Sequence, residues 1–108
     1  MTAKTTHQNI LLSPQDNDRL ANLCGLLDEN LRQIESYMNV EISNRGNAFR
    51  IKGDKNNVPL TSNLIEKLYK ISAYEELTPR QLHMYMNKTT NDITAKKYLG
   101  LDSENNEI

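Results

Sequence analysis

The sequence has a single cysteine, no long apolar run and almost no net charge, −1 at pH 7 over 108 residues. One cysteine excludes a framework of internal disulfides. No apolar run approaches the ~18 residues of a membrane span, and the N-terminus lacks the apolar stretch and cleavage site of a signal peptide. These absences predict a cytoplasmic protein that does not interact with a membrane.

Basic residues are not in excess. The chain has 13 Lys and Arg against 14 Asp and Glu, whereas a free-standing nucleic-acid binder usually shows a clear basic excess. Counterion release would therefore contribute little affinity unless the charges are sorted to one side of the fold. With 37% hydrophobic and 25% charged residues, the composition is typical of one globular domain with a modest core.

The sequence also lacks the motifs of common catalytic and cofactor sites. None of the four glycines begins the G-x-x-x-x-G-K-[ST] loop that wraps nucleotide phosphates. The cysteine and two histidines show no zinc spacing, and no paired carboxylates stand out. Cys24 lies on an apolar face, which favours a small core residue over a nucleophile activated by His7 or His83. We therefore expect no catalytic residue, no metal site and no enzyme activity in this chain.

The first half of the chain is predicted to form a strand and two helices. Residues 7–12 end in an apolar triplet and are predicted as a strand. Ser13 and Pro14 suit the N-cap and first position of a helix, which is predicted to end at Gly25. A second helix ending near Asn39 is predicted by a stripe of apolar residues: Leu27, Leu31, Ile34 and Met38.

The second half is predicted to form a hairpin and a helix. Apolar and polar residues alternate in residues 40–43 and 48–52, which predicts two strands. The turn between them contains Gly46, which can supply a positive φ. A third helix is predicted at about residues 57–72, with Pro59 tolerated in its first turn.

A short amphipathic helix is predicted after this core. Thr78 and Gln81 match a capping box. The apolar side of such a helix must either complete the core or dock onto another domain or subunit, and the protein-docking candidates are Leu82, Tyr85 and Met86. Residues 1–6 are predicted to be disordered and residues 88–108 to form a polar linker, which leaves residues 7–87 as the folded domain.

The order β-α-α-β-β-α, with a glycine between the first two helices, resembles a type I KH domain. Residues 24–28 fall at the hydrophobic-G-x-x-G loop of that family, and Leu31 and Ile34 match its following helix. The run VEISNRGNAFRIKG, residues 40–53, matches the two strands and their connection. The resemblance implies an α+β fold in which helices pack on one face of a three-stranded sheet, with an extra C-terminal helix.

A longer run, DNDRLANLCGLLDENLRQIESYMNVEISNRGNAFRIKG, is similar to the N-terminal domain of PhoH-like proteins, which are bacterial cytoplasmic P-loop ATPases. The resemblance covers roughly residues 7–87. It implies that an ATPase domain follows the linker and that ATP and Mg²⁺ bind only in the full-length protein. It also implies a link to RNA metabolism, with an endoribonuclease of the YbeY type as a partner.

The Gly25 loop departs from the KH pattern at its second glycine, which is replaced by Asp28. In a working G-x-x-G turn the RNA backbone approaches peptide groups free of side chains. A carboxylate there repels phosphate and can cap the helix itself. Whether the loop is a corner between helices or a contact for RNA stays open. The nucleic-acid contact candidates are Gly25, Leu26, Leu27, Asp28, Arg32, Arg45, Arg50 and Lys52.

Two functional hypotheses follow. In the first, the domain is an accessory RNA-interaction module that binds single-stranded RNA weakly for the ATPase domain or a partner nuclease. The basic candidates would then line a groove between the second helix and the strand edge, unless they form an ordinary mixed-charge surface with Glu35 and Glu41. In the second, the domain docks onto its own ATPase domain, other subunits or a partner protein and does not bind RNA. The first is the leading hypothesis, and the degenerate loop, the neutral charge and the extra helix are the sequence support for the second.

Overall fold

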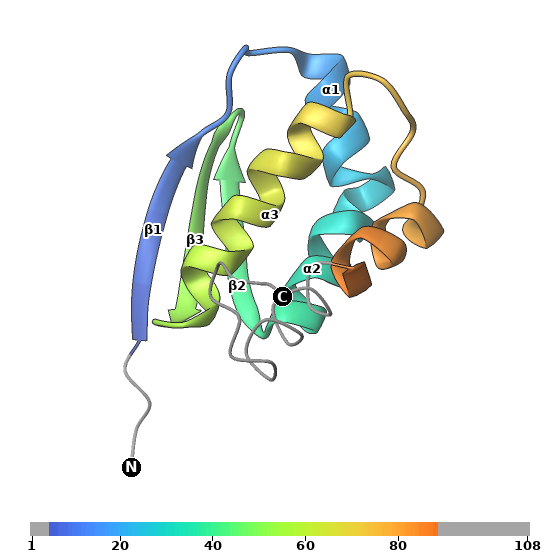
Figure 1. Ribbon diagram of the computed structural model, residues 1–108. Helices are drawn as coiled ribbons and strands as arrows, with labels where there is room; N and C mark the ends of the chain where they lie inside the picture. The colour runs from blue at the N-terminus through green and yellow to red at the C-terminus, as the bar shows by residue number, and fades with distance from the viewer. Residues whose placement is uncertain (1–4, 89–108) are drawn as a thin grey trace, which may run out of the picture.

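The computed structural model describes residues 5–88, so residues 1–4 of the segment predicted to be disordered and residues 89–108 of the linker predicted at 88–108 lie outside this range. Its order confirms the predicted α+β, β-α-α-β-β-α arrangement (Figure 1). The elements are β1 (Thr5–Leu11), α1 (Asn17–Cys24), a 3₁₀ turn (Leu26–Asp28), α2 (Glu29–Met38), β2 (Val40–Arg45), β3 (Ala48–Asp54) and α3 (Asn57–Ile71). Residues 79–88 form the predicted additional helix.

The sheet is antiparallel, with β3 in the centre between β1 and β2. Ile10 lies opposite Phe49, and Ile42 lies opposite Ile51. The helices cover one face of the sheet (Figure 1). All four residues are buried and therefore belong to that face. Side chains alternate along each strand, so the neighbours of these residues lie on the opposite, uncovered face.

The core lies between the sheet and the helices. From α2 it contains Leu31 and Ile34, and from α3 Ile65 and Leu68, each fully buried. The apolar stripe in the sequence predicted the burial of Leu31 and Ile34, since apolar residues three or four positions apart share one face of a helix. No helix within residues 5–88 is long and apolar enough to cross a membrane.

The additional helix completes this core, which corrects two of the three docking candidates. Leu82 and Met86 are 0% and 1% exposed and belong to the core cluster, so a partner cannot reach them. Tyr85 is partly buried against the same cluster, and its hydroxyl donates to a carboxylate oxygen of Glu75 at 3.0 Å. The predicted cap is confirmed, because the Gln81 amide donates to Thr78 Oγ1 at 3.2 Å.

The first strand and the first helix both begin elsewhere than predicted. β1 begins at Thr5, which pairs with Asp54 at the end of β3, so it extends into the segment predicted to be disordered. The N-cap of α1 is Asp16 rather than Ser13, and its carboxylate accepts from the Asp18 and Arg19 amides at 3.0 and 3.2 Å.

A distant contact explains the later start of α1. The Tyr69 hydroxyl, on α3, donates to the Pro14 carbonyl at 2.6 Å. The Asp16 amide in turn donates to the same hydroxyl at 3.2 Å. These bonds hold the residues around Pro14 as a connection against α3, and the helix begins only after them.

The predicted hairpin turn and the predicted end of the second helix are confirmed. Arg45 pairs with Ala48, which leaves a two-residue hairpin turn in which Gly46 has a φ of +59°. Asn39 ends α2 with a left-handed backbone, φ +56°, a conformation that Asn adopts more readily than most residues.

Candidate functional site

The loop between α1 and α2 is a tight junction of unusual backbone geometry. The Gly25 amide ends α1 by donating to the Ala21 carbonyl at 2.9 Å, and its carbonyl accepts from the Asp28 amide at 3.1 Å. Gly25 has a φ of +81°, and Leu27 and Asp28 follow with φ values of +53° and +59°. Residues other than glycine rarely adopt such values, so neighbouring contacts must hold this backbone in place.

Asp28 does not cap α2, contrary to the sequence-based expectation. An N-cap side chain reaches the following amides from an extended backbone, whereas Asp28 has left-handed φ and ψ of +59° and +26° and makes no capping hydrogen bond. Its carboxylate remains close enough to Cys24 to raise the pKa of that thiol. The loop therefore presents a free negative charge where KH-type recognition would need an accessible backbone.

The middle of the loop is apolar and exposed. Leu26 is 77% exposed and Leu27 is 92% exposed. Leu27 therefore does not belong to the buried stripe predicted for the second helix, and the first buried residue of that stripe is Leu31. The left-handed backbone places Leu27 before the first turn of α2 and turns it to solvent. Since residues 24–30 contain no Lys or Arg, the loop offers no cation to a phosphate.

Two asparagines hold the loop in place, and sequence reasoning missed both. Asn30 is fully buried, and its side-chain amide donates to the Leu77 carbonyl at 2.8 Å and the Asn22 carbonyl at 3.3 Å. The Asn22 amide donates to the carbonyls of Ser72 and Glu75 at 3.1 and 2.8 Å, and its Oδ1 accepts from the Leu77 amide at 2.8 Å. The only signal in the sequence is an asparagine, Asn30, beside the apolar stripe.

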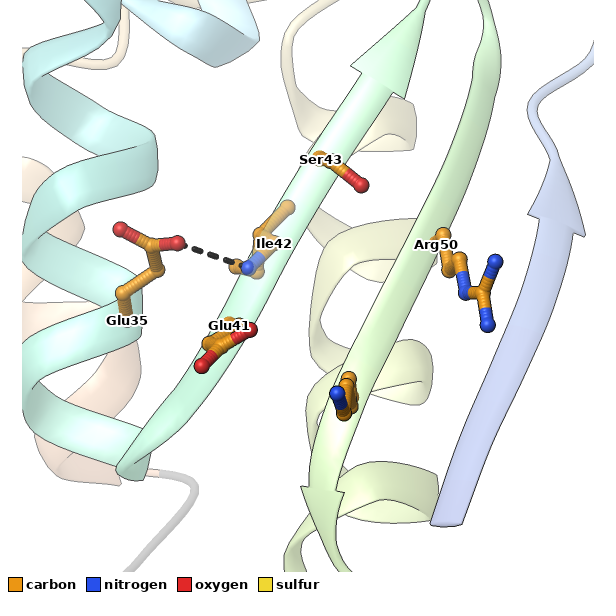
Figure 2. Close-up of a pocket in the computed structure, with 6 residues that line it drawn as sticks. Glu35, Glu41, Ile42, Ser43 and Arg50 are labelled. Atoms are coloured by element: carbon orange, nitrogen blue, oxygen red, sulfur yellow. Dashed lines mark hydrogen bonds between the residues drawn. The ribbon is translucent and has the colours of Figure 1, made fainter.

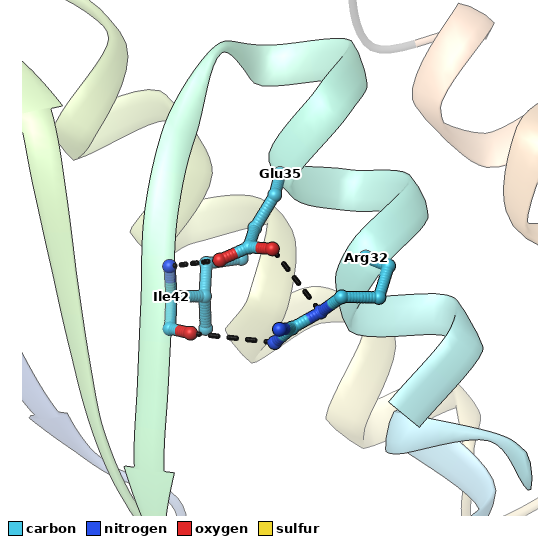
Figure 3. Close-up of polar contacts among 3 residues, drawn as sticks. All are labelled: Arg32, Glu35 and Ile42. Atoms are coloured by element: carbon cyan, nitrogen blue, oxygen red, sulfur yellow. Dashed lines mark hydrogen bonds and ion pairs between the residues drawn. The ribbon is translucent and has the colours of Figure 1, made fainter. Parts of the chain in front are cut away.

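Arg32 is held at the free edge of the sheet. β2 is an edge strand, and the Ile42 amide donates to Glu35 Oε2 at 2.7 Å while the Ile42 carbonyl accepts from Arg32 Nη2 at 3.5 Å (Figure 3). Arg32 Nε and Glu35 Oε1 form an ion pair at 3.1 Å. The two side chains therefore bind the outward amide and carbonyl of Ile42, which would otherwise be free to pair with another chain.

The remaining basic candidates lie on the uncovered face of the sheet. Figure 2 shows this face, with Ser43 on β2 and Arg50 on β3. The strand register places Arg50 between Ser43 of β2 and Asn9 of β1. Lys52 lies opposite Glu41, and Arg45 lies opposite Ala48. All three basic residues are exposed. Within residues 5–88 the one ion pair is Arg32–Glu35, so these three cations have no ionic partner there.

The predicted groove therefore forms only in part. A shallow hollow of about 550 Å³ extends from Glu35 over β2 to Arg50 and Lys52. Arg45 instead lines a second hollow farther along the same face, while Arg32 and the Gly25 loop belong to the helix layer. The period-2 alternation of β3 separates these groups, because it directs Arg50 and Lys52 away from the helices.

Cys24 is a buried core residue, as its apolar neighbours predict. Burial, and secondarily the Asp28 carboxylate, raise the pKa of its thiol from 9.0 to about 11. Within residues 5–88 no three His, Cys, Asp or Glu side chains gather in a way that could hold a metal ion.

We expect Cys24 to react slowly with iodoacetamide in the folded protein. At pH 8 a pKa of about 11 leaves roughly 100-fold less thiolate than a pKa of 9.0, and only the thiolate is nucleophilic. Because folding disfavours the thiolate, this group contributes stability below pH 9 that is lost as the pH rises toward 11. Alkylation at equal rates in native buffer and in guanidinium chloride would contradict this assignment.

Solved structures share this fold. Dim2p from Pyrococcus horikoshii OT3 matches with a TM-score of 0.62 and 17% identity, over 78% of this chain and 49% of that chain. A chain of the a/eIF2alpha–aDim2p–rRNA complex from the same organism matches with a TM-score of 0.61 and 17% identity, over 82% and 48%. A protein of unknown function from Aeropyrum pernix, APE0754, matches with 0.63 and 14%, over 90% and 52%.

These likenesses concern the fold. The chain spans about half the length of the structures it matches. No protein-family model matches the sequence. The element order, the sheet order β1-β3-β2 and the glycine junction between α1 and α2 define a KH-like fold.

Proposed function

We propose that the domain is an RNA-interaction module that binds single-stranded RNA through the uncovered face of its sheet. The observation that carries the proposal is the group of three exposed cations without an ionic partner in residues 5–88, Arg45, Arg50 and Lys52. Phosphates bound by such cations release their counterions, which supplies affinity independently of sequence. Asn9 and Ser43 lie beside Arg50 and add polar groups for sugar or base contacts.

Two further observations support RNA as the ligand. The fold is shared with a chain that was crystallised in a complex containing rRNA, so an RNA ligand is compatible with this architecture. The charged candidate residues are also separated in space, because the Gly25 loop carries only acidic residues while the uncovered sheet face carries three basic residues, Arg45, Arg50 and Lys52, with Glu41 opposite Lys52. Sorting of this kind lets a chain with no net positive charge attract a phosphate backbone locally.

Titration of a labelled single-stranded RNA tests this function. With about three phosphate contacts, log K is expected to fall with log salt concentration with a slope of roughly −2. Arg50→Glu combined with Lys52→Glu is expected to weaken binding at least about 10-fold at low salt, since two attractions become repulsions. Anisotropy measured at two salt concentrations gives both quantities.

Lys67→Glu combined with Lys70→Glu is the matched control. These lysines are exposed on α3, in the helix layer, and their reversal changes the net charge equally. The control is expected to bind within about 2-fold of the unaltered domain when both are measured at about 0.1 M salt, because screening then limits charge effects to roughly 10 Å. Equal losses in both double variants, or no binding by the unaltered folded domain at low salt, would refute the proposal.

We further infer that this module is the non-catalytic, cytoplasmic N-terminal part of a PhoH-like ATPase acting in RNA metabolism. ATP and Mg²⁺ would then bind in the ATPase domain, and a YbeY-type endoribonuclease would be a partner. The support is the sequence resemblance over roughly residues 7–87. A Walker A motif encoded soon after Ile108 is expected in the gene. A downstream reading frame without one would count against this context.

Protein docking is the second candidate function, and one observation favours it. The docking residues expected on the last helix, Leu82 and Met86, are in the core, but Leu26 and Leu27 project into solvent from the Gly25 loop. Exposed apolar side chains that lie next to each other are typical of surfaces that contact another protein.

A further inference from the structure

The exposed end of the Gly25 loop combines apolar and acidic groups. We call Leu26, Leu27, Asp28 and Glu29 the leucine tip. The two leucines are 77% and 92% exposed, and the two acids are exposed without an ionic partner in residues 5–88. Glu76, also exposed, precedes Leu77, whose backbone binds Asn22 and Asn30 on either side of the tip. The leucine tip therefore exposes two leucines next to the acidic residues Asp28, Glu29 and Glu76.

The uncovered sheet face carries the complementary combination. Leu11, Ala48 and Arg45 lie side by side across β1, β3 and β2, and Arg50 lies two residues along β3 from Ala48. We call these four residues the arginine face. Leu11 is 68% exposed, and a hollow of about 440 Å³ is lined by Arg45, Ala48 and Arg50. An apolar spot is therefore flanked by two guanidinium groups.

We propose that the leucine tip of one copy docks onto the arginine face of a second copy. The leucines would cover Leu11 and Ala48, and Asp28 and Glu29 would meet Arg45 and Arg50. Arg–carboxylate pairs provide both attraction and geometric specificity at such a contact. In Figure 1 the sheet lies to the left and the α1–α2 junction, in the helix layer, lies to the right beyond α3. One copy can therefore offer its tip and its face to two different neighbours.

Such a contact is head-to-tail and not two-fold. A heterologous contact produces rings or open chains, depending on whether the rotation between copies closes. The surfaces involved are small, so the isolated domain is expected to associate weakly and in a salt-sensitive manner. Because RNA and a second copy would use the same arginines, each should exclude the other from this face. Only this mutual exclusion rests on the proposed RNA binding.

Complementation between two blocked variants of the full 108-residue chain tests the proposal. Leu27→Asp replaces the more exposed leucine of the leucine tip by a charged residue and so blocks its apolar contact. Aspartate is compatible with the left-handed backbone at that position. Arg45→Glu with Arg50→Glu removes the face. In sedimentation velocity at low salt, the unaltered chain should gain average mass with concentration, and each variant alone should stay monomeric. An equimolar mixture should form a 1:1 dimer and nothing larger, since it retains one tip and one matching face.

Lys67→Glu, on α3, is the control variant and should associate like the unaltered chain. The proposal is overturned if the unaltered chain is monomeric up to about 1 mM, if either blocked variant associates like the unaltered chain, or if the mixture of the two stays monomeric. RNA binding is measured separately on the Leu27→Asp variant, which keeps the arginine face. A failure of RNA binding and a failure of self-association are therefore distinguishable.

Discussion

Gly25→Ala is expected to destabilise the domain by about 3 kcal/mol or more. Gly25 has φ and ψ of +81° and +173°, a region that is essentially restricted to glycine. An added Cβ would also lie 2.8 Å from Cγ of the buried Asn30. Relief of that clash would disturb the bonds from Asn30 to Leu77 and Asn22. Urea unfolding monitored by circular dichroism measures the loss.

Gly46→Ala is the matched control, because it changes the same residue type at another positive φ. Gly46 has a φ of +59°, and an added Cβ would meet nothing within 4 Å. Its cost is the conformational preference alone, about 1 kcal/mol. Equal destabilisation by the two substitutions would show that the packing around Gly25 is not what fixes the loop.

Asn22→Ala is expected to cost about 3 kcal/mol. Its side chain makes three hydrogen bonds to the segment that follows α3, at 2.8 to 3.1 Å. The substitution would leave the amide of Leu77 without its acceptor, and Leu77 is 3% exposed. An unsatisfied buried donor costs roughly 1–3 kcal/mol in addition to the bonds lost. Thermal unfolding should show the midpoint lowered by more than about 10 °C.

Asn63→Ala separates this effect from a general effect of losing an asparagine. Asn63 is exposed on α3, where alanine is the better helix former. Its replacement is expected to leave stability within about 0.5 kcal/mol. If Asn22→Ala were equally neutral, the segment from Ser72 to Leu77 would not depend on the asparagine for its position.

The local features of the fold were predictable from the sequence. The apolar stripe that begins at Leu27 predicted α2, although Leu27 itself lies exposed before that helix. The alternation in residues 48–52 predicted β3, and Gly46 and Thr78 marked a turn and a helix start that the structure confirms. These features depend on residues within one or two turns of each other, where side-chain periodicity and capping preferences act directly.

Features set by distant contacts were not predictable. Ser13 has the residue type of an N-cap. The N-cap is nevertheless Asp16, because the hydroxyl of Tyr69, 55 residues beyond Pro14, binds the Pro14 carbonyl and keeps this segment out of the helix. Apolarity alone could not tell whether Leu82 faces the core or a partner, since both surroundings favour apolar groups.

The candidate site shows the same division. The basic residues were identified from the sequence, but their distribution over two surfaces depends on sheet register and on the bonds from Arg32 and Glu35 to Ile42. The roles of Asn22 and Asn30 depend on carbonyls 47 to 53 residues away. No local pattern encodes either arrangement.

The central claim is that RNA contacts the sheet face that carries Arg45, Arg50 and Lys52. Amide chemical-shift mapping of the ¹⁵N-labelled domain during titration with a short single-stranded RNA tests it most directly. Shifts are expected to concentrate at residues 43–52 and at the neighbouring residues 7–11 of β1, with little change at residues 25–28. Shifts concentrated at residues 25–34, with the sheet face unchanged, would contradict the claim and return the RNA contact to the Gly25 loop.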